Sequence, residues 1–259
     1  MSMSNKSFWL ASVIIAGLLV FVASREVSSM WVLSAQQPGE SLDIPVLDYE
    51  TETHKIVGKE RKQKNDRFNA LGNPEKTKEV AELRAGTEPL PTNSHWWVGL
   101  PALPVSQSDA IVLGEVTEAE AHLSGDKTGI YSEFLVQVEE VFKESGGPLT
   151  VGDVLSVNRV GGGVRFASGK VQQYKIARQG MLHKGSRYVL FLRQTTDNDL
   201  LILTGYELSG GRVIPVDGED IKDARSDLPF VLYRGADQSR LLQDLKAAIL
   251  ANRDREGVK

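Results

Sequence analysis

Three glycines between two arginines form the part of this sequence whose residue types could do chemistry. Glycine gives the backbone freedom and exposes amide groups, and such amides beside cationic side chains can bind an anion. The candidate ligand-binding residues are Arg159, Gly161, Gly162, Gly163 and Arg165. The alternative interpretation is a plain connection between two strands, with both arginines in solvent. The sequence alone leaves both interpretations open.

The sequence contains no catalytic motif that we can identify. Its Ser-Gly dipeptides lack the Gly-x-Ser-x-Gly spacing of a hydrolase elbow, and the stretch from Gly163 to Lys170 is one residue too long for a phosphate-binding P-loop. The four histidines have no metal-ligand spacing, so we expect no zinc site. We therefore predict a non-enzymatic protein with no metal, no cofactor and no catalytic residue. The alternative is an enzyme or small-ligand-binding domain whose site is not legible in the sequence.

The composition narrows the classes of partner. The 259 residues include no cysteine, which excludes disulfides, thiolate metal sites and thiol nucleophiles. The formal net charge of -4 gives no overall attraction for nucleic acid, so a nucleic-acid partner is disfavoured. We expect the folded domain to be held together by its own apolar core.

An uncharged and almost entirely apolar run occupies residues 8–23. Such a run belongs in a membrane or in the export machinery. Lys6 precedes the run, whereas Arg25 and Glu26 cancel after it, so the positive-inside bias predicts a cytoplasmic N-terminus and an extracytoplasmic domain. We predict a signal anchor over residues 1–33. The alternative is a cleaved signal peptide and a secreted or periplasmic protein.

The next segment, residues 34–103, is predicted to be a tether because apolar residues are sparse and Pro, Gly, Asn, Lys and Glu are frequent. We expect it to be largely disordered, with a short helix near residues 74–85. A basic cluster in this segment could attract an anionic surface or polymer, or could be a solvated charged stretch. The cluster consists of Lys55, Lys59, Arg61, Lys62, Lys64 and Arg67.

Short strand patterns separated by turn signals fill residues 104–218. The segments of strand length are 110–117, 130–142, 154–160, 188–192, 200–203 and 212–215. With no long helix between them, an antiparallel sheet closed as a small β-barrel is the natural solution. The alternation in the second segment shifts phase at Glu139, which predicts a bulge or the bend of a coiled barrel strand.

The last segment, residues 219–259, is predicted to contain a helix. Asp237 is a plausible N-cap, and apolar residues follow it at helical spacing. The apolar stripe consists of Leu241, Leu242, Leu245, Ala248 and Ile249. We expect this stripe to pack on the barrel; a partner-binding helix is the alternative.

Four segments resemble the strands of a known fold. They read SDAIVLGEV from Ser108, EFLVQVEEVFK from Glu133, VGDVLSV from Val151 and KGSRYVLFL from Lys184. The series is similar to the OB-like barrel of the netrin-module and tissue-inhibitor-of-metalloproteinases type, as in uncharacterised bacterial exported proteins. The motifs are structural, so the resemblance implies a fold rather than an activity. Inhibitors of that type chelate the target's zinc through an N-terminal cysteine, which this chain lacks.

Together, these patterns predict a mainly β protein. The expected architecture is a small antiparallel OB-like barrel with a C-terminal helix, preceded by an N-terminal apolar helix and a flexible tether. The expected function is that of a membrane-tethered, extracytoplasmic interaction module. Its partners would be the membrane, through the N-terminal helix, and an unknown protein or envelope polymer.

Overall fold

The computed structural model describes residues 44–69, 99–145, 147–174, 176, 178–195, 199–218 and 228–256. The expected signal anchor and the expected helix near residues 74–85 lie outside these residues. Within the described ranges, no helix has the length and apolar character needed to cross a membrane.

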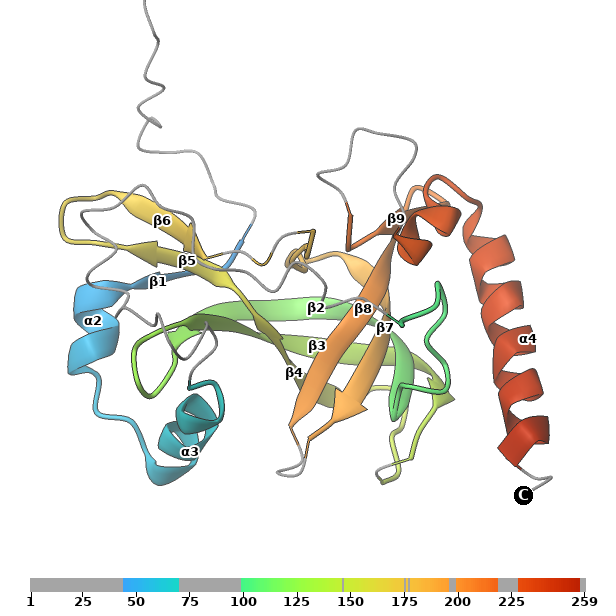
Figure 1. Cartoon of the computed structure of the whole chain (residues 1–259), viewed down its shortest axis with the longest axis horizontal. Coiled ribbons are helices and arrows are strands. Elements are labelled where there is room, and N and C mark those ends of the chain that lie inside the picture. Colours follow the sequence, from blue (N-terminus) through green and yellow to red (C-terminus); the bar gives the residue numbers. More distant parts are fainter. Residues whose placement is uncertain are drawn as a thin grey trace, which may run out of the picture. The chain divides into compact units, whose positions relative to one another are not determined.

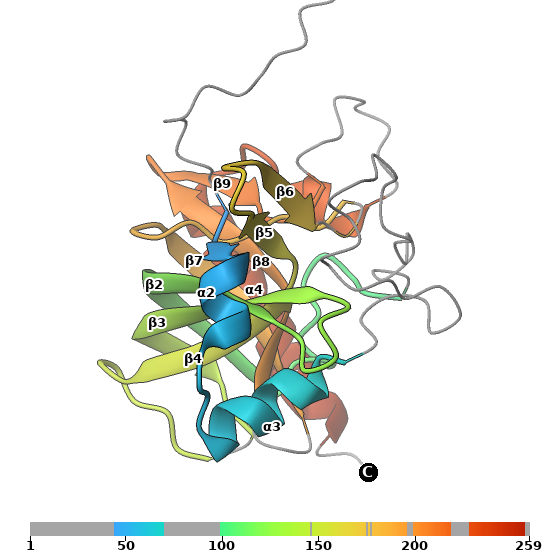
Figure 2. The same ribbon diagram turned by 90° about the vertical axis from the view of Figure 1, so that its left-hand side faces the viewer.

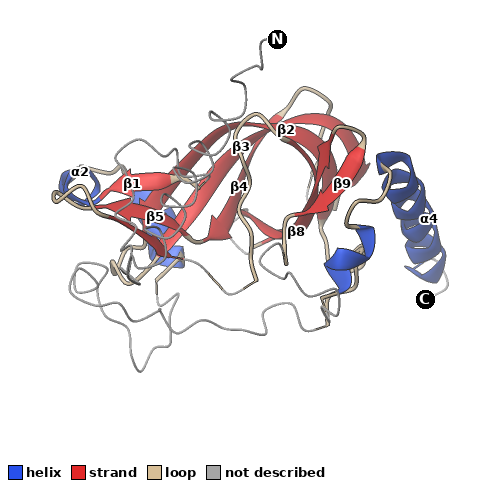
Figure 3. Ribbon diagram, turned by 90° about the horizontal axis from the view of Figure 1, so that it is seen from above, coloured by secondary structure: helices blue, strands red, loops and turns tan. Residues whose placement is uncertain are grey.

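The largest sheet of this mainly β chain closes on itself (Figure 1). Its strands are β2 (Ala110–Leu123), β3 (Ile130–Lys143), β4 (Val154–Val160), β7 (Arg187–Gln194), β8 (Leu200–Ser209) and β9 (Arg212–Pro215). They lie in the order β4-β3-β2-β7-β8-β9, and neighbouring strands are antiparallel. A parallel pairing of β4 with β8, at Val157 with Leu200 and Asn158 with Leu201, joins the two sides. The hydrogen bonds of β4, β3, β2, β7 and β8 therefore form a ring, which Figure 3 shows from above.

The strand segments predicted from the sequence are confirmed, because each of them lies within one strand of this sheet. The predicted bulge is confirmed too. Val138 pairs with Gly114 and Glu140 pairs with Leu113, so Glu139 has no partner on β2. A residue left out of the pairing bends the strand and increases its twist, which helps a long strand to follow a ring.

Apolar side chains from all five strands of the ring meet in one cluster. Its members include Val112, Val136, Val157, Leu190 and Ile202, one from each strand. Because successive residues of a strand point to opposite faces, the alternation seen in the sequence places these side chains on the inner side of the ring. Each buried side chain of this size contributes about 1.5–3 kcal/mol to the hydrophobic stabilisation.

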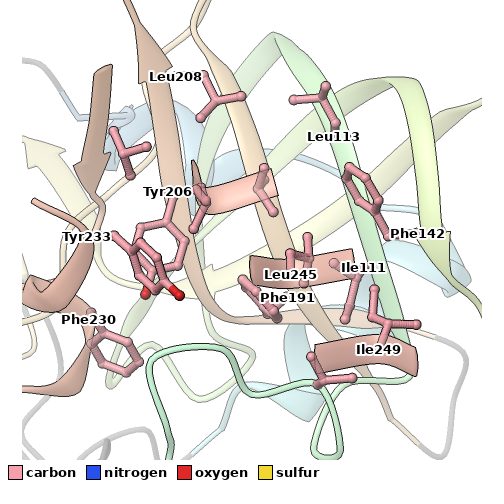
Figure 4. Packing of buried hydrophobic residues seen from close by; sticks show 14 of the residues in the cluster. Ile111, Leu113, Phe142, Phe191, Tyr206, Leu208, Phe230, Tyr233, Leu245 and Ile249 are labelled. Carbon is pink, nitrogen blue, oxygen red and sulfur yellow. The ribbon is translucent and has the colours of Figure 1, made fainter. Parts of the chain in front are cut away.

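The helix α4 (Gln238–Glu256) covers the outer side of β2, β7 and β8 (Figure 4). Phe191 of β7 and Tyr206 of β8 pack there with Leu245 and Ile249 of α4, and the short helix η2 (Pro229–Tyr233) adds Phe230. The prediction that the C-terminal stripe packs on the sheet is confirmed. Because β7 is covered on both faces, its sequence is a continuous apolar run rather than an alternating one.

A smaller sheet stands beside the ring. It consists of β1 (Val46–Asp48), β5 (Gly162–Arg165) and β6 (Val171–Tyr174), with β5 in the middle. After β1 come α2 (Tyr49–His54) and α3 (Lys59–Arg67), which stand in the foreground of Figure 2, with α2 above α3.

This N-terminal part differs from the tether that we expected for residues 34–103. Residues 44–69 form a strand and two helices that pack on the rest of the chain. Leu47 and Tyr49 are buried with Val164 and Phe166, and Phe68 is also buried. A few well-placed apolar residues therefore suffice to dock a segment whose composition is mostly polar.

Candidate functional site

The two arginines of the candidate loop lie in different surroundings. Arg159 is only 1% exposed on β4, and its guanidinium is paired with the fully buried carboxylate of Asp217. Asp217 also accepts hydrogen bonds from Thr204 Oγ1 at 2.8 Å and from the Gly180 amide at 3.0 Å. Arg165 is half-exposed, and its Nη1 lies 3.6 Å from Asp48 Oδ1. The structure does not bring the two arginines together around one ligand.

The sequence carried a signal for the position of Arg159. Leu155, Val157 and Arg159 alternate along β4, and the first two belong to the inner cluster. Alternation therefore places Arg159 on the inner side of the ring, where a charged group requires a partner of opposite charge.

The glycines of this loop do not form an anion-binding nest. The Gly161 amide donates to Ile130 O at 2.8 Å, and the Gly163 amide donates to Pro45 O at 2.8 Å. Gly162 and Gly163 belong to β5, and a Cβ added to Gly162 would lie 2.9 Å from Ile130 Cγ2. The glycines are needed because the backbone passes close to its neighbours. This geometry favours the alternative interpretation in so far as the loop connects strands, but only Arg165, and not Arg159, lies in solvent.

A different polar constellation lies on the outer side of β3 and β4, under α3. We call it the Glu133 cluster, and it consists of Arg61, Lys64, His122, Tyr131, Glu133 and Ser156. Glu133 Oε2 accepts a hydrogen bond from Arg61 Nη1 at 2.5 Å, and Glu133 Oε1 accepts one from Lys64 Nζ at 2.6 Å. Ser156 donates to the same Oε1 at 2.5 Å. One carboxylate thus binds two cations of a helix.

Local sequence patterns place these groups face to face. On β3, Phe134 and Val136 point into the ring, so Glu133 points outward. On α3, Arg61 and Lys64 are three residues apart and therefore share one face of the helix. Lys64 Nζ also donates to Ser156 Oγ at 3.1 Å, which ties the helix to β4 as well.

The electrostatics of the Glu133 cluster suit binding rather than proton transfer. Burial raises the pKa of Glu133, but the hydrogen bonds from Lys64, Ser156 and Arg61 outweigh it and lower the pKa to about 2. Burial raises the pKa of the Tyr131 hydroxyl to about 12. At neutral pH the carboxyl is therefore ionised and the phenol is neutral, so Glu133 acts as a fixed anion.

His122 lies between α2 and the cluster, with its side chain 3% exposed. Its Nδ1 is 3.4 Å from Glu52 Oε1, and its Nε2 is 3.6 Å from Glu133 Oε2. Burial raises the pKa of Glu52. The hydrogen bond to His122 and the nearby positive charges lower it by more, so the pKa of Glu52 lies below its ordinary value. Among the residues that the structure describes, no group of three or more His, Asp or Glu side chains could hold a metal ion.

The contacts of α3 extend beyond the cluster to two loops. Phe68, just after the helix, stacks on Tyr131, and Asn65 Oδ1 accepts the Tyr131 hydroxyl at 2.6 Å. The Gly125 amide, in the turn between β2 and β3, donates to Asn65 O at 2.9 Å. Arg67 pairs with Asp199, which lies just before β8. The Asp126 amide donates to Asn69 Oδ1 at 2.8 Å. We define the α3 face as the surface formed by Gly125, Asp126, Tyr131, Glu133, Ser156 and Asp199.

Sequence reasoning missed the α3 face, although its parts were visible. Arg61, Lys64 and Arg67 belong to the basic cluster that the sequence left open between a solvated stretch and an anion-binding one. Glu133, the partner of Arg61 and Lys64, is 72 residues from Arg61 in sequence. A single chain gives no signal for a pairing over that separation.

A scan of the chain against protein-family models found no match, and a search of curated proteins found none either. The proposal for function therefore rests on the geometry of the site.

Proposed function

We propose that this chain is a non-enzymatic interaction module in which an OB-like barrel binds a polypeptide on the α3 face. The pairing order supports the barrel. The strands β2, β3 and β4 follow one another in the sheet, and β7 returns to lie beside β2. This order is that of a Greek key, and the OB fold is a five-stranded Greek-key barrel. The resemblance to the netrin-type barrel rests on the same four strands, β2, β3, β4 and β7.

The position of α3 supports the choice of face. OB folds bind oligonucleotides and oligosaccharides on their second and third strands and on the loops that join strands one to two and four to five, so this is the face on which the fold holds its ligands. The corresponding parts here are β3, β4, the β2–β3 turn and the β7–β8 connection. Each of these four parts contacts α3 through at least one residue. The residues include Tyr131 on β3, Ser156 on β4, Gly125 in the β2–β3 turn and Asp199 in the β7–β8 connection.

The observation that carries the proposal is the binding of Arg61 and Lys64 by the carboxylate of Glu133. It is an example, within the chain, of how this face holds a helix. Without α3, this face presents the carboxylates of Glu133 and Asp199, which repel nucleic acids and anionic envelope polymers, so a protein ligand is favoured over both.

The location of the module is part of the proposal. The apolar run at residues 8–23 supports a membrane anchor, and the charges beside it support a domain outside the cytoplasm. The ligand would then be a protein of the envelope or of the extracellular space.

Site-specific photo-crosslinking in intact cells tests the proposal. Val154 is 57% exposed on β4, and by alternation it points to the same side as Ser156. A photoreactive residue at position 154 of the full chain is expected to give a protease-sensitive adduct, and Glu133→Gln is expected to reduce it. The matched control is position 232, which is 64% exposed in η2. Equal adducts from both positions, or adducts that Glu133→Gln leaves unchanged, would refute a polypeptide-binding α3 face.

A further inference from the structure

We propose that α3 is an internal occupant of the α3 face, and that the ligand which replaces it is a basic polypeptide helix. This inference rests on the proposed function, because it names the ligand class and the regulation of the same face.

The contacts made by α3 itself are polar, and the apolar anchor of the segment is Phe68, just after the helix. None of its residues, Lys59–Arg67, is buried, whereas Leu241 and Leu245 of α4 are fully buried. The side chains of Arg61, Lys64 and Glu133 keep 32%, 11% and 13% of their surface in solvent, and all three become fully hydrated once the helix undocks, which offsets part of the loss of their ion pairs. The inner cluster of the ring contains no residue of α3. The helix can therefore leave the face while the ring stays folded.

The face from which α3 departs selects its replacement by charge and shape. The carboxylates of Glu133 and Asp199 would lose the cations Arg61, Lys64 and Arg67. The ring of Tyr131 would lose its stacked partner, Phe68.

A ligand that restores these contacts carries the same groups at the same spacing. Arg61 and Lys64 are three residues apart, and Phe68 follows four residues later. These three residues point to a helix with two cations on one face, followed one turn later by an aromatic residue.

The two occupants exclude each other. Both oxygens of Glu133 are already engaged by α3, and one face of the Tyr131 ring is covered by Phe68. A ligand can therefore bind only the fraction of molecules in which α3 is undocked, and its apparent affinity falls by that fraction. Because α3 belongs to the same chain, its effective concentration at the face is high.

The chain permits a reversible covalent lock on α3. It contains no cysteine, so an introduced pair would be unique. A Cβ added to Gly125 would lie 3.1 Å from Asp66 Cγ, close to where the sulfur of a cysteine at position 66 would stand. The double variant Asp66→Cys/Gly125→Cys is therefore placed to form a disulfide between the end of α3 and the β2–β3 turn.

The test measures the binding of a fluorescent peptide with the sequence of residues 59–69, KERKQKNDRFN, to the full chain in detergent micelles. The open variant Arg61→Gln/Lys64→Gln, which weakens the docked helix, is expected to bind the peptide at least about tenfold more tightly than the unmodified chain. The oxidised lock is expected to abolish binding, and reduction of the same sample is expected to restore it. Arg253→Gln/Arg255→Gln, which removes two charges at the end of α4, is the matched control and is expected to change nothing.

Three results would overturn the inference. They are equal binding by the locked and the open forms, unchanged binding after Glu133→Gln is added to the open variant, and no binding by the open variant. The last result leaves the crosslinking at position 154 as the separate test of the proposed function. If the open variant does not fold, Phe68→Ala opens the same face by removing the aromatic contact instead of the charges.

Discussion

Phe68 lies flat on Tyr131, with ring centroids 4.0 Å apart and ring planes inclined by 7°. Tyr131 is fully buried and Phe68 is 5% exposed, so the pair is an apolar anchor at the end of a polar helix. The burial of the ring and the stacking together contribute about 2–4 kcal/mol to the docking of this segment.

Replacing Phe68 by alanine is therefore expected to release α3 locally while the ring stays folded. Hydrogen exchange measures this directly, because the Gly125 amide donates to Asn65 only while the segment is docked. Its protection should fall, and the amides of β7 should keep theirs. Loss of protection throughout β7 would show instead that the segment is required for the fold of the ring.

Glu133 predicts a stability difference that depends on pH. Its pKa is about 2 in the folded chain and 4.5 ordinarily, so its stabilising contribution is complete above about pH 4.5 and is lost as the pH falls towards 2. The free energy of urea unfolding should be up to roughly 3 kcal/mol lower for Glu133→Gln at pH 6, and the two proteins should converge only below about pH 2. A difference that stays constant over this range would contradict the role of the ionised carboxylate.

Replacing Arg159 is expected to cost much more stability than replacing Arg165. Arg159→Ala leaves the buried Asp217 without its cation and should cost about 3–5 kcal/mol. Arg165→Ala removes an exposed ion pair with Asp48 and should change stability by less than about 1 kcal/mol. Urea unfolding of the two variants checks this, and equal losses would contradict the assignment of Arg159 to the core.

Leu190 is fully buried in the middle of β7, which lies between β2 and β8. Leu190→Ala should therefore cost about 2–5 kcal/mol, because it leaves a cavity inside the ring. Leu232→Ala is the matched control, since Leu232 is 64% exposed and its loss should cost less than about 0.5 kcal/mol. Thermal unfolding would separate them by several degrees.

The N-terminal run predicts retention in the membrane. Ile15→Arg and Leu18→Arg place charges in the middle of the expected span, and each costs roughly 2.5–3.5 kcal/mol on insertion scales. Fractionation should show the double variant released from the membrane or blocked in export. A mature chain that begins at Arg25 or Gln36 would instead indicate a cleaved signal peptide.

The strands and α4 could be predicted from the sequence because their signals are local. Val136 and Val138 alternate with polar residues along β3, and Leu241 and Leu245 recur with the period of a helix. Burial on one face imposes such periods directly on the sequence. The shift at Glu139 was legible for the same reason.

The α3 face could not be predicted because its contacts join distant residues of ordinary type. Arg61 and Glu133 each fit a solvated surface when taken alone, and only the closure of the chain brings them together. The loop from Arg159 to Arg165 misled for the opposite reason. Glycine and arginine are typical of binding loops, but Gly162 is required here by close packing and Arg159 by the carboxylate of Asp217.

The pairing of β4 with β8 has a consequence for how partners can be recognised. In an open sheet these strands would expose unpaired amide and carbonyl groups, which invite another chain to add a strand. Here they satisfy each other, and beyond the ring the Val213 amide of β9 donates to Ala236 O at 2.9 Å. At these positions the six-stranded sheet therefore offers no free edge to which another chain could add a strand. Recognition by this sheet is left to the side chains on its outer surface.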